Sequence, residues 1–174
     1  VLTGVAVSVF LIASQAMQKQ QARIPAGEEL SQGLQKAGRR MREAIETIDE
    51  YKHINQTIQY QDVEDGRDYL LYLYSPDDAV LNNAYERRAL YQLRLAPVTG
   101  FVYGTGEILV RSVLSPSAPD GEDRAVVRYT GKAGDRMFEL ILTVAETLQP
   151  VAEKTEKVKM RLYVRPRNQG TLPL

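Results

Sequence analysis

Two acidic turns carry the residue types best suited to holding a metal ion. The first runs from Asp62 to Asp68 (DVEDGRD), and the second contains Asp120, Glu122 and Asp123. A calcium loop places oxygen ligands at alternating positions and closes with a bidentate Glu, and the first turn has neither feature. A solvated hairpin turn is the favoured interpretation. Both turns stay open as calcium sites, and no metal ligand is assigned.

The other residues that could take part in catalysis or ligand binding do not form a catalytic set. Tyr103-Gly104-Thr105-Gly106 contains GxG but leads into an apolar run typical of a strand, which favours a hairpin turn over a phosphate cradle. The lone His53 has no Ser or Cys at a suggestive spacing. Nucleotide-binding, metalloprotease and GxSxG motifs do not occur in the sequence. The sequence therefore predicts no catalytic residue, no cofactor and no small-molecule substrate, and the chain is expected not to be an enzyme.

Composition narrows the classes of partner. The 174 residues suit one domain, and 22 basic against 22 acidic residues give a net charge of zero. That balance argues against a nucleic-acid binder that relies on a basic surface. There is no Cys, which excludes a disulfide scaffold and a zinc ribbon and leaves the redox compartment open.

The first 18 residues, VLTGVAVSVFLIASQAMQ, contain no charge. As a helix they would be about 27 Å long, close to the ~30 Å hydrocarbon core of a bilayer. A membrane or assembly helix is favoured over a buried core helix or a signal-peptide remnant, because no basic n-region precedes the segment. Its expected membrane or filament contacts are Val1, Leu2, Gly4, Val5, Val7, Val9, Phe10, Leu11 and Ile12.

Residues 19–52 are expected to continue that helix in amphipathic form, with a kink near Pro25. Apolar residues recur at steps of three or four and predict a single stripe that packs on a sheet. The stripe consists of Leu30, Leu34, Ala37, Met41, Ile45 and Ile48.

From about residue 53 onwards, apolar residues recur at every second position instead of every three or four. Runs at 69–74, 89–95, 107–113, 125–129, 138–144 and 157–164 are separated by turn residues and predict successive antiparallel strands. In the last run Lys157, Lys159 and Arg161 share one face. The predicted fold class is α+β, with a long N-terminal helix packed on an antiparallel sheet. The expected parts are a hydrophobic helix at 1–18, its amphipathic continuation at 19–52 and a sheet domain at 53–174.

Three segments carry a resemblance to a known family. VLTGVAVSVFLIASQA looks like the latter part of the hydrophobic helix of type IV pilins, with Gly4 where those helices commonly carry glycine. ELSQGLQKAGRRMREA (residues 29–44) is similar to the second half-helix of minor pilins and J-class type II secretion pseudopilins, and the run from Val158 to Asn168 is similar to their last strand. By this resemblance the leader, its cleavage site and the assembly glutamate precede Val1.

The resemblance implies a structural subunit that assembles through its hydrophobic N-terminal helix. Its partners would be other pilin or pseudopilin subunits. It would reside in the bacterial inner membrane as a single-pass protein with a periplasmic domain before it enters a filament or its tip. The alternative from another class is a membrane-anchored extracytoplasmic ligand-binding or sensor domain. The sequence does not separate a pilus subunit from a secretion pseudopilin, or a tip subunit from a repeating one.

Overall fold

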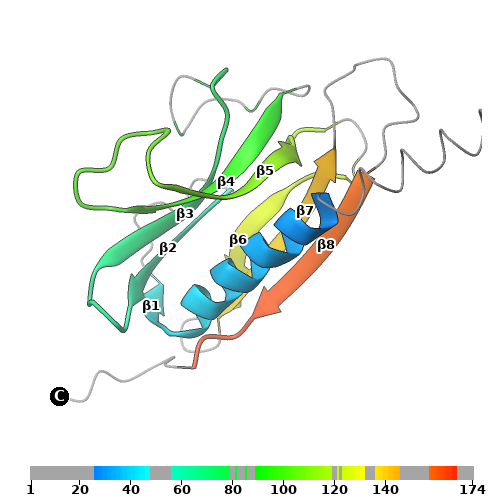
Figure 1. Cartoon of the computed structure of the whole chain (residues 1–174). Helices are drawn as coiled ribbons and strands as arrows, with labels where there is room; N and C mark the ends of the chain where they lie inside the picture. Colours follow the sequence, from blue (N-terminus) through cyan, green and yellow to red (C-terminus); the bar gives the residue numbers. More distant parts are fainter. Residues whose placement is uncertain are drawn as a thin grey trace, which may run out of the picture.

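The chain was analysed as a computed structural model that describes residues 26–47, 56–78, 81, 85, 89–118, 121, 123–131, 136–145 and 157–167. Within these residues, a helix at 26–42 is followed by eight strands that form one sheet (Figure 1). The strands are β1 (Ala44–Thr47), β2 (Thr57–Asp62), β3 (Asp68–Tyr74), β4 (Leu90–Pro97), β5 (Glu107–Leu114), β6 (Val126–Thr130), β7 (Met137–Ala145) and β8 (Lys157–Val164).

The sheet is antiparallel throughout and curls until it is nearly closed. The strand order is β1-β2-β3-β4-β5-β7-β6, and β8 pairs with the other edge of β7. Among the described residues, β5 meets β7 through the pair Val113 and Val144, while β6 pairs with the earlier half of β7. The curl brings β6 back towards β2, where the Val127 N–H donates to Gln56 Oε1 at 3.1 Å.

Irregular pairing between β4 and β5 accounts for part of this curvature. Their register shifts between Tyr91 and Leu93 and again between Leu93 and Arg94. Ser112 of β5 has a φ of 56°, in the left-handed region that non-glycine residues seldom adopt. Bulges of this kind bend a strand and increase its twist, so the sheet turns a corner here instead of staying flat.

The main core lies on the concave side, between the helix and the strands. In Figure 1 the helix runs along this side next to β8, and contacts of Gly27 and Gly38 with β8 side chains agree with that view. The largest fully buried side chains of this main core are Leu30, Met41, Ile58, Tyr60, Leu71, Leu73, Tyr91, Leu93, Phe138 and Leu140.

A second, smaller core lies on the convex side of β3 and β4. Leu70, Tyr72, Leu81 and Ala96 are buried there, with Tyr74, Val98, Phe101 and Tyr103 packed against them. The connection from β4 to β5 supplies the last three, so this loop covers the outer face of the sheet. A strand buried on both faces reads as a continuous apolar run, which explains the sequence YLLYLY at 69–74.

The predicted fold class was wrong. The helix is short and ends at residue 42, and the fold is mostly β, with a curled sheet in place of a long helix on a flat one. The chain leaves the helix at Glu43, and residues 44–47 pair with β2 as β1. Ile45 and Thr47 are β-branched residues that favour strands, and the spacing of Ile45 from Met41 coincided with a helical period.

The strand predictions fared better than the fold class. Each of the six predicted runs overlaps one of the strands β3 to β8, and all of these pair antiparallel as expected. β1 and β2 were not predicted. Residues 1–18, His53 and the expected boundary at residue 52 lie outside the described residues. Within the part of the chain that the structure describes, no helix is both long enough and apolar enough to cross a membrane.

Candidate functional site

The buried face of the helix fixes it to the sheet. Leu30, Leu34, Ala37 and Met41 of the predicted stripe are all buried in the main core. Ile45 belongs to β1 instead of the helix, and Ile48 lies outside the described residues. The helix is therefore a rigid part of the sheet domain from residue 26 onwards.

Two glycines set how closely the helix approaches the strands, and sequence reasoning did not single them out. A Cβ on Gly33 would lie 2.3 Å from the backbone oxygen of Leu109 in β5. A Cβ on Gly38 would lie 3.0 Å from a methyl group of Leu162 in β8. Glycine is unfavourable inside a helix, so its presence twice in an otherwise amphipathic pattern was the available signal of close packing.

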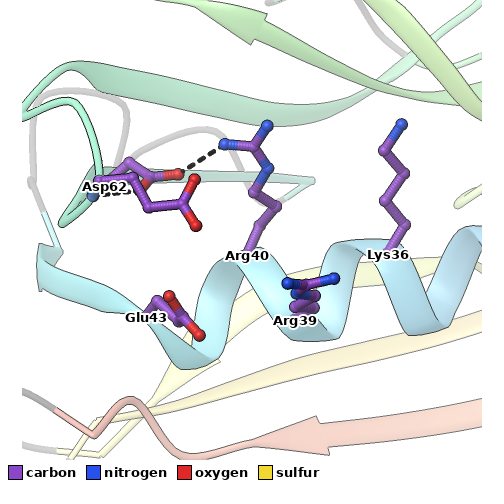
Figure 2. Close-up of a pocket in the computed structure, with 6 residues that line it drawn as sticks. Lys36, Arg39, Arg40, Glu43 and Asp62 are labelled. Atoms are coloured by element: carbon purple, nitrogen blue, oxygen red, sulfur yellow. Dashed lines mark hydrogen bonds and ion pairs between the residues drawn. The ribbon is translucent and has the colours of Figure 1, made fainter.

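Ion pairs also connect the helix to the β2–β3 hairpin and to β5. Arg40 Nη1 lies 3.0 Å from Asp62 Oδ2 (Figure 2). Lys36 pairs with Glu107 of β5. Asp62 is only 1% exposed, so its charge needs the Arg40 partner. The hydrogen bond to Asp62 raises the pKa of Arg40 above its ordinary value, against the opposing effect of burial.

A small cavity lies between the helix and this hairpin. Lys36, Arg39, Arg40, Glu43, Asp62 and Glu64 line about 230 Å³ of space. Figure 2 shows Arg40 and Lys36 pointing from the helix towards the hairpin side. The volume is below the ~300–1,000 Å³ of typical small-molecule sites, and Asp62, Arg40 and Lys36 already have charged partners. The arrangement serves to join two elements.

Two carboxylates of the first acidic turn, those of Asp62 and Asp65, have partners within the turn or on the helix. Asp62 Oδ1 accepts from the Glu64 N–H at 2.9 Å, while Asp65 accepts from the Arg67 N–H and from the Tyr69 hydroxyl. The bond from Tyr69, followed by that from Arg67, lowers the pKa of Asp65. The described residues contain no group of three or more His, Cys, Asp or Glu placed to hold a metal ion. Of the second turn, Asp120 and Glu122 lie outside the described residues.

The GxG segment is part of the β4–β5 hairpin connection, as predicted. The Gly104 and Gly106 φ values are 93° and 94°, and a Cβ on Gly106 would meet the Leu95 backbone oxygen at 2.4 Å. The Tyr72 hydroxyl donates to Thr105 O at 2.6 Å, and Arg94 stacks on Tyr74 with 4.5 Å to the ring centroid. These contacts fix the loop on the sheet, so the tyrosines at 72 and 74 serve packing.

The outward side of β8 is strongly basic. The segment 157–167 has five basic residues and no acidic one, namely Lys157, Lys159, Arg161, Arg165 and Arg167. The inward Val158, Met160 and Leu162 pack against the main core, and Tyr163 is 50% exposed among the basic residues. Glu139, which faces Tyr163 across the β7–β8 pair, already binds Arg128 at 2.7 Å.

The expected membrane or filament residues, from Val1 to Ile12, lie outside the described residues. The described residues contain three notable features: the packing of the helix on the sheet, the ion pairs between the helix and the β2–β3 hairpin, and the basic side of β8. Comparison with known proteins adds no relative: no family model matches the chain, and no curated protein or solved structure is similar to it.

Proposed function

We propose that this chain is a minor pilin or pseudopilin, a structural subunit that assembles through its apolar N-terminal segment. One observation carries the proposal. A segment of 18 residues without charge precedes, by only a few residues, a helix that is seated in the sheet domain through Leu30, Leu34, Ala37 and Met41. The domain would therefore follow the position of the apolar segment.

The apolar segment would occupy two environments in turn, the lipid bilayer and the filament. In a bilayer an apolar helix satisfies its own backbone groups, which keeps the subunit in the membrane before assembly. In a filament the same surface would pack against neighbouring helices, and small residues such as Gly4 and Ser8 permit close approach. The sheet domain would then present its loops and β8 to other subunits on the periplasmic or extracellular side.

The N-terminus of the protein from its native membrane is the decisive measurement. We expect intact-mass and peptide analysis to find several further apolar residues before Val1 and an N-methylated first residue, as leader-peptidase processing produces. An unprocessed terminus, or one with a cytoplasmic extension, would contradict the proposal and favour the membrane-anchored binding domain.

A charge in the apolar segment tests assembly directly. Val9→Asp places a carboxylate in a surface that must be apolar in lipid and in a helix bundle, at a cost of about 2.5–3.5 kcal/mol in a membrane helix. We expect the variant to be lost from membrane and filament fractions, while a Thr3→Ser control behaves as the parent. Normal incorporation of the Val9→Asp chain would refute the proposal.

A further inference from the structure

We propose that the basic side of β8 binds the acidic β2–β3 hairpin of a second copy of this chain. The inference rests on the proposed function, because it names a subunit contact for the same assembly. The chain has no net charge, but the charge is unevenly distributed over the fold. Two surfaces of opposite sign therefore exist on one molecule.

Two of the basic side chains on β8 lie next to no acidic partner within the described residues. Lys159 and Arg161 have no ion-pair partner within the described residues, and they alternate along β8 with core-facing Met160 and Leu162. In the described residues β8 pairs only with β7, so it is an edge strand. A lysine-rich edge discourages indiscriminate strand pairing but leaves the side chains available to an acidic partner.

The acidic surface is the tip of the β2–β3 hairpin. Residues 62–68 contain four carboxylates, from Asp62, Glu64, Asp65 and Asp68, and the one guanidinium of Arg67. Asp62 and Glu64 also line the cavity that they share with Lys36, Arg39 and Arg40 of the helix. Asp62 is buried and paired with Arg40, while Glu64 and Asp65 are exposed. Val63 immediately precedes Glu64 and is 44% exposed.

The two surfaces match in composition as well as in charge. Each has one exposed apolar side chain among charges of a single dominant sign, Tyr163 on β8 and Val63 on the hairpin. An apolar centre with a charged rim is the usual layout of a protein interface. Tyr163 against Val63 would form the centre, with Arg161 and Lys159 facing Glu64 and Asp65.

The positions of the two surfaces make the contact head-to-tail. The hairpin and β8 lie on opposite sides of the helix (Figure 1), and Arg40 on one side and Gly38 on the other make the respective contacts. A contact between unlike surfaces does not have to close on itself and can repeat along a filament. A symmetric dimer formed through β8 alone would instead bring like charges together.

Cysteine cross-linking in the full chain tests the contact, since the sequence has no cysteine of its own. Val63→Cys and Tyr163→Cys are combined in one chain and oxidised in the native membrane and in filament fractions. We expect a ladder of disulfide-linked multimers. The control pair Val63→Cys with Val102→Cys uses a residue that is 61% exposed on the β4–β5 loop and should give no ladder.

Charge reversal tests the electrostatic basis of the same contact. Arg161→Glu in the cross-linking chain should lower the yield about three- to fivefold at low salt, because an exposed charge pair is replaced by repulsion. Adding Glu64→Arg should restore it. Failure of the second reversal to restore the yield would contradict the pairing of these surfaces.

The other possible results of the cross-linking experiment also test the proposed contact. Three results would each overturn the second-copy contact: the absence of a ladder, dimers linked only through the Tyr163→Cys thiols of both copies, or a disulfide between that thiol and a different protein. An N-methylated terminus in the same preparation would still support the filament proposal. Conversely, normal assembly of Val9→Asp would refute that proposal without changing the cross-linking result.

Discussion

The two sides of the helix are held in different ways. Around Gly33, which faces the β5 backbone, and Gly38, which faces Leu162 of β8, the contact is close packing, and it depends above all on Gly33 having no side chain. Towards the β2–β3 hairpin it consists of paired charges, chiefly Arg40 with buried Asp62. Packing at van der Waals distance tolerates no added atom, whereas partly exposed ion pairs tolerate rearrangement. Gly33 should therefore be the position most sensitive to substitution.

The largest effect is expected from Gly33→Ala. The new methyl group would overlap the Leu109 backbone oxygen, which cannot move without shifting β5. We expect a loss of about 3 kcal/mol in the free energy of unfolding, after an intrinsic helix gain of about 1 kcal/mol is included.

Gly38→Ala is the matched control for that substitution. Its new methyl group would press on the flexible end of Leu162 and make an ordinary contact with Val164, so stability should change by less than about 1 kcal/mol. Urea unfolding followed by circular dichroism measures both variants. Equal losses at the two glycines would show that backbone contact at Gly33 does not limit the approach of the helix.

Arg40→Met should have the next largest effect, because it leaves the Asp62 carboxylate buried without its partner. The 37% exposure of the Arg40 side chain reduces the cost of a broken buried pair to about 1–2 kcal/mol. Arg111→Met removes a pair that is 3.9 Å long and well exposed at both ends, and should cost less than about 0.5 kcal/mol. A similar loss in both variants would mean that burial of Asp62 does not set the cost.

Alkaline pH should lower the stability of the fold through the small core on the convex side of β3 and β4. Burial raises the pKa of Tyr103 to about 12, and burial also raises the pKa of Tyr72. A raised pKa in the folded state stabilises the fold below the ordinary value of 10.0 and loses that contribution as pH rises through the folded pKa. We expect the urea midpoint to fall as pH rises from 10.0 to about 12, and Tyr103→Phe to reduce that dependence. A midpoint that does not change over this range would contradict the prediction.

The smallest effect is expected at acid pH in the hairpin turn. Bonds from Tyr69 and Arg67 hold the pKa of Asp65 below its ordinary value of 3.8. This contribution is present above that value and is lost as pH falls through the lower, folded pKa. Asp65→Asn should therefore flatten the fall in stability below about pH 4. If Asp65→Asn left the fall in stability at acid pH unchanged, the turn would not depend on the Asp65 charge.

The sequence predicted strands well where one period dominated. β8 alternates Lys157, Lys159 and Arg161 with Val158, Met160 and Leu162, and its predicted bounds match the structure. β2 was missed because Thr57 and Gln59 are polar yet buried, so its alternation carries no hydrophobic contrast. The hairpin turn at Asp65-Gly66 was predicted, but the strand that it requires on its N-terminal side was not.

The helix end and the closure of the sheet could not be obtained from local pattern. Met41 and Ile45 continue a helical spacing, but pairing of β1 with β2 takes Ile45 out of the helix. Closure depends on bulges at Tyr91 to Arg94 and on the meeting of Val113 with Val144, which are distant in sequence. Of the candidate site, the helix stripe was predictable in part, whereas Gly33, Gly38 and the Arg40–Asp62 pair depend on the tertiary fold.

The contact between Gly38 and Leu162 has a consequence for when the domain can fold. Most of the chain separates these residues, and the Arg167 N–H donates to Arg42 O at the end of the helix. Closing such a long loop is slow, so the helix gains its final support only after β8 has been synthesised and paired. A chain that emerges gradually would thus expose the apolar face of Leu30, Leu34 and Met41 until its last strand arrives. Truncation just before β8 should therefore produce a species that holdase chaperones retain.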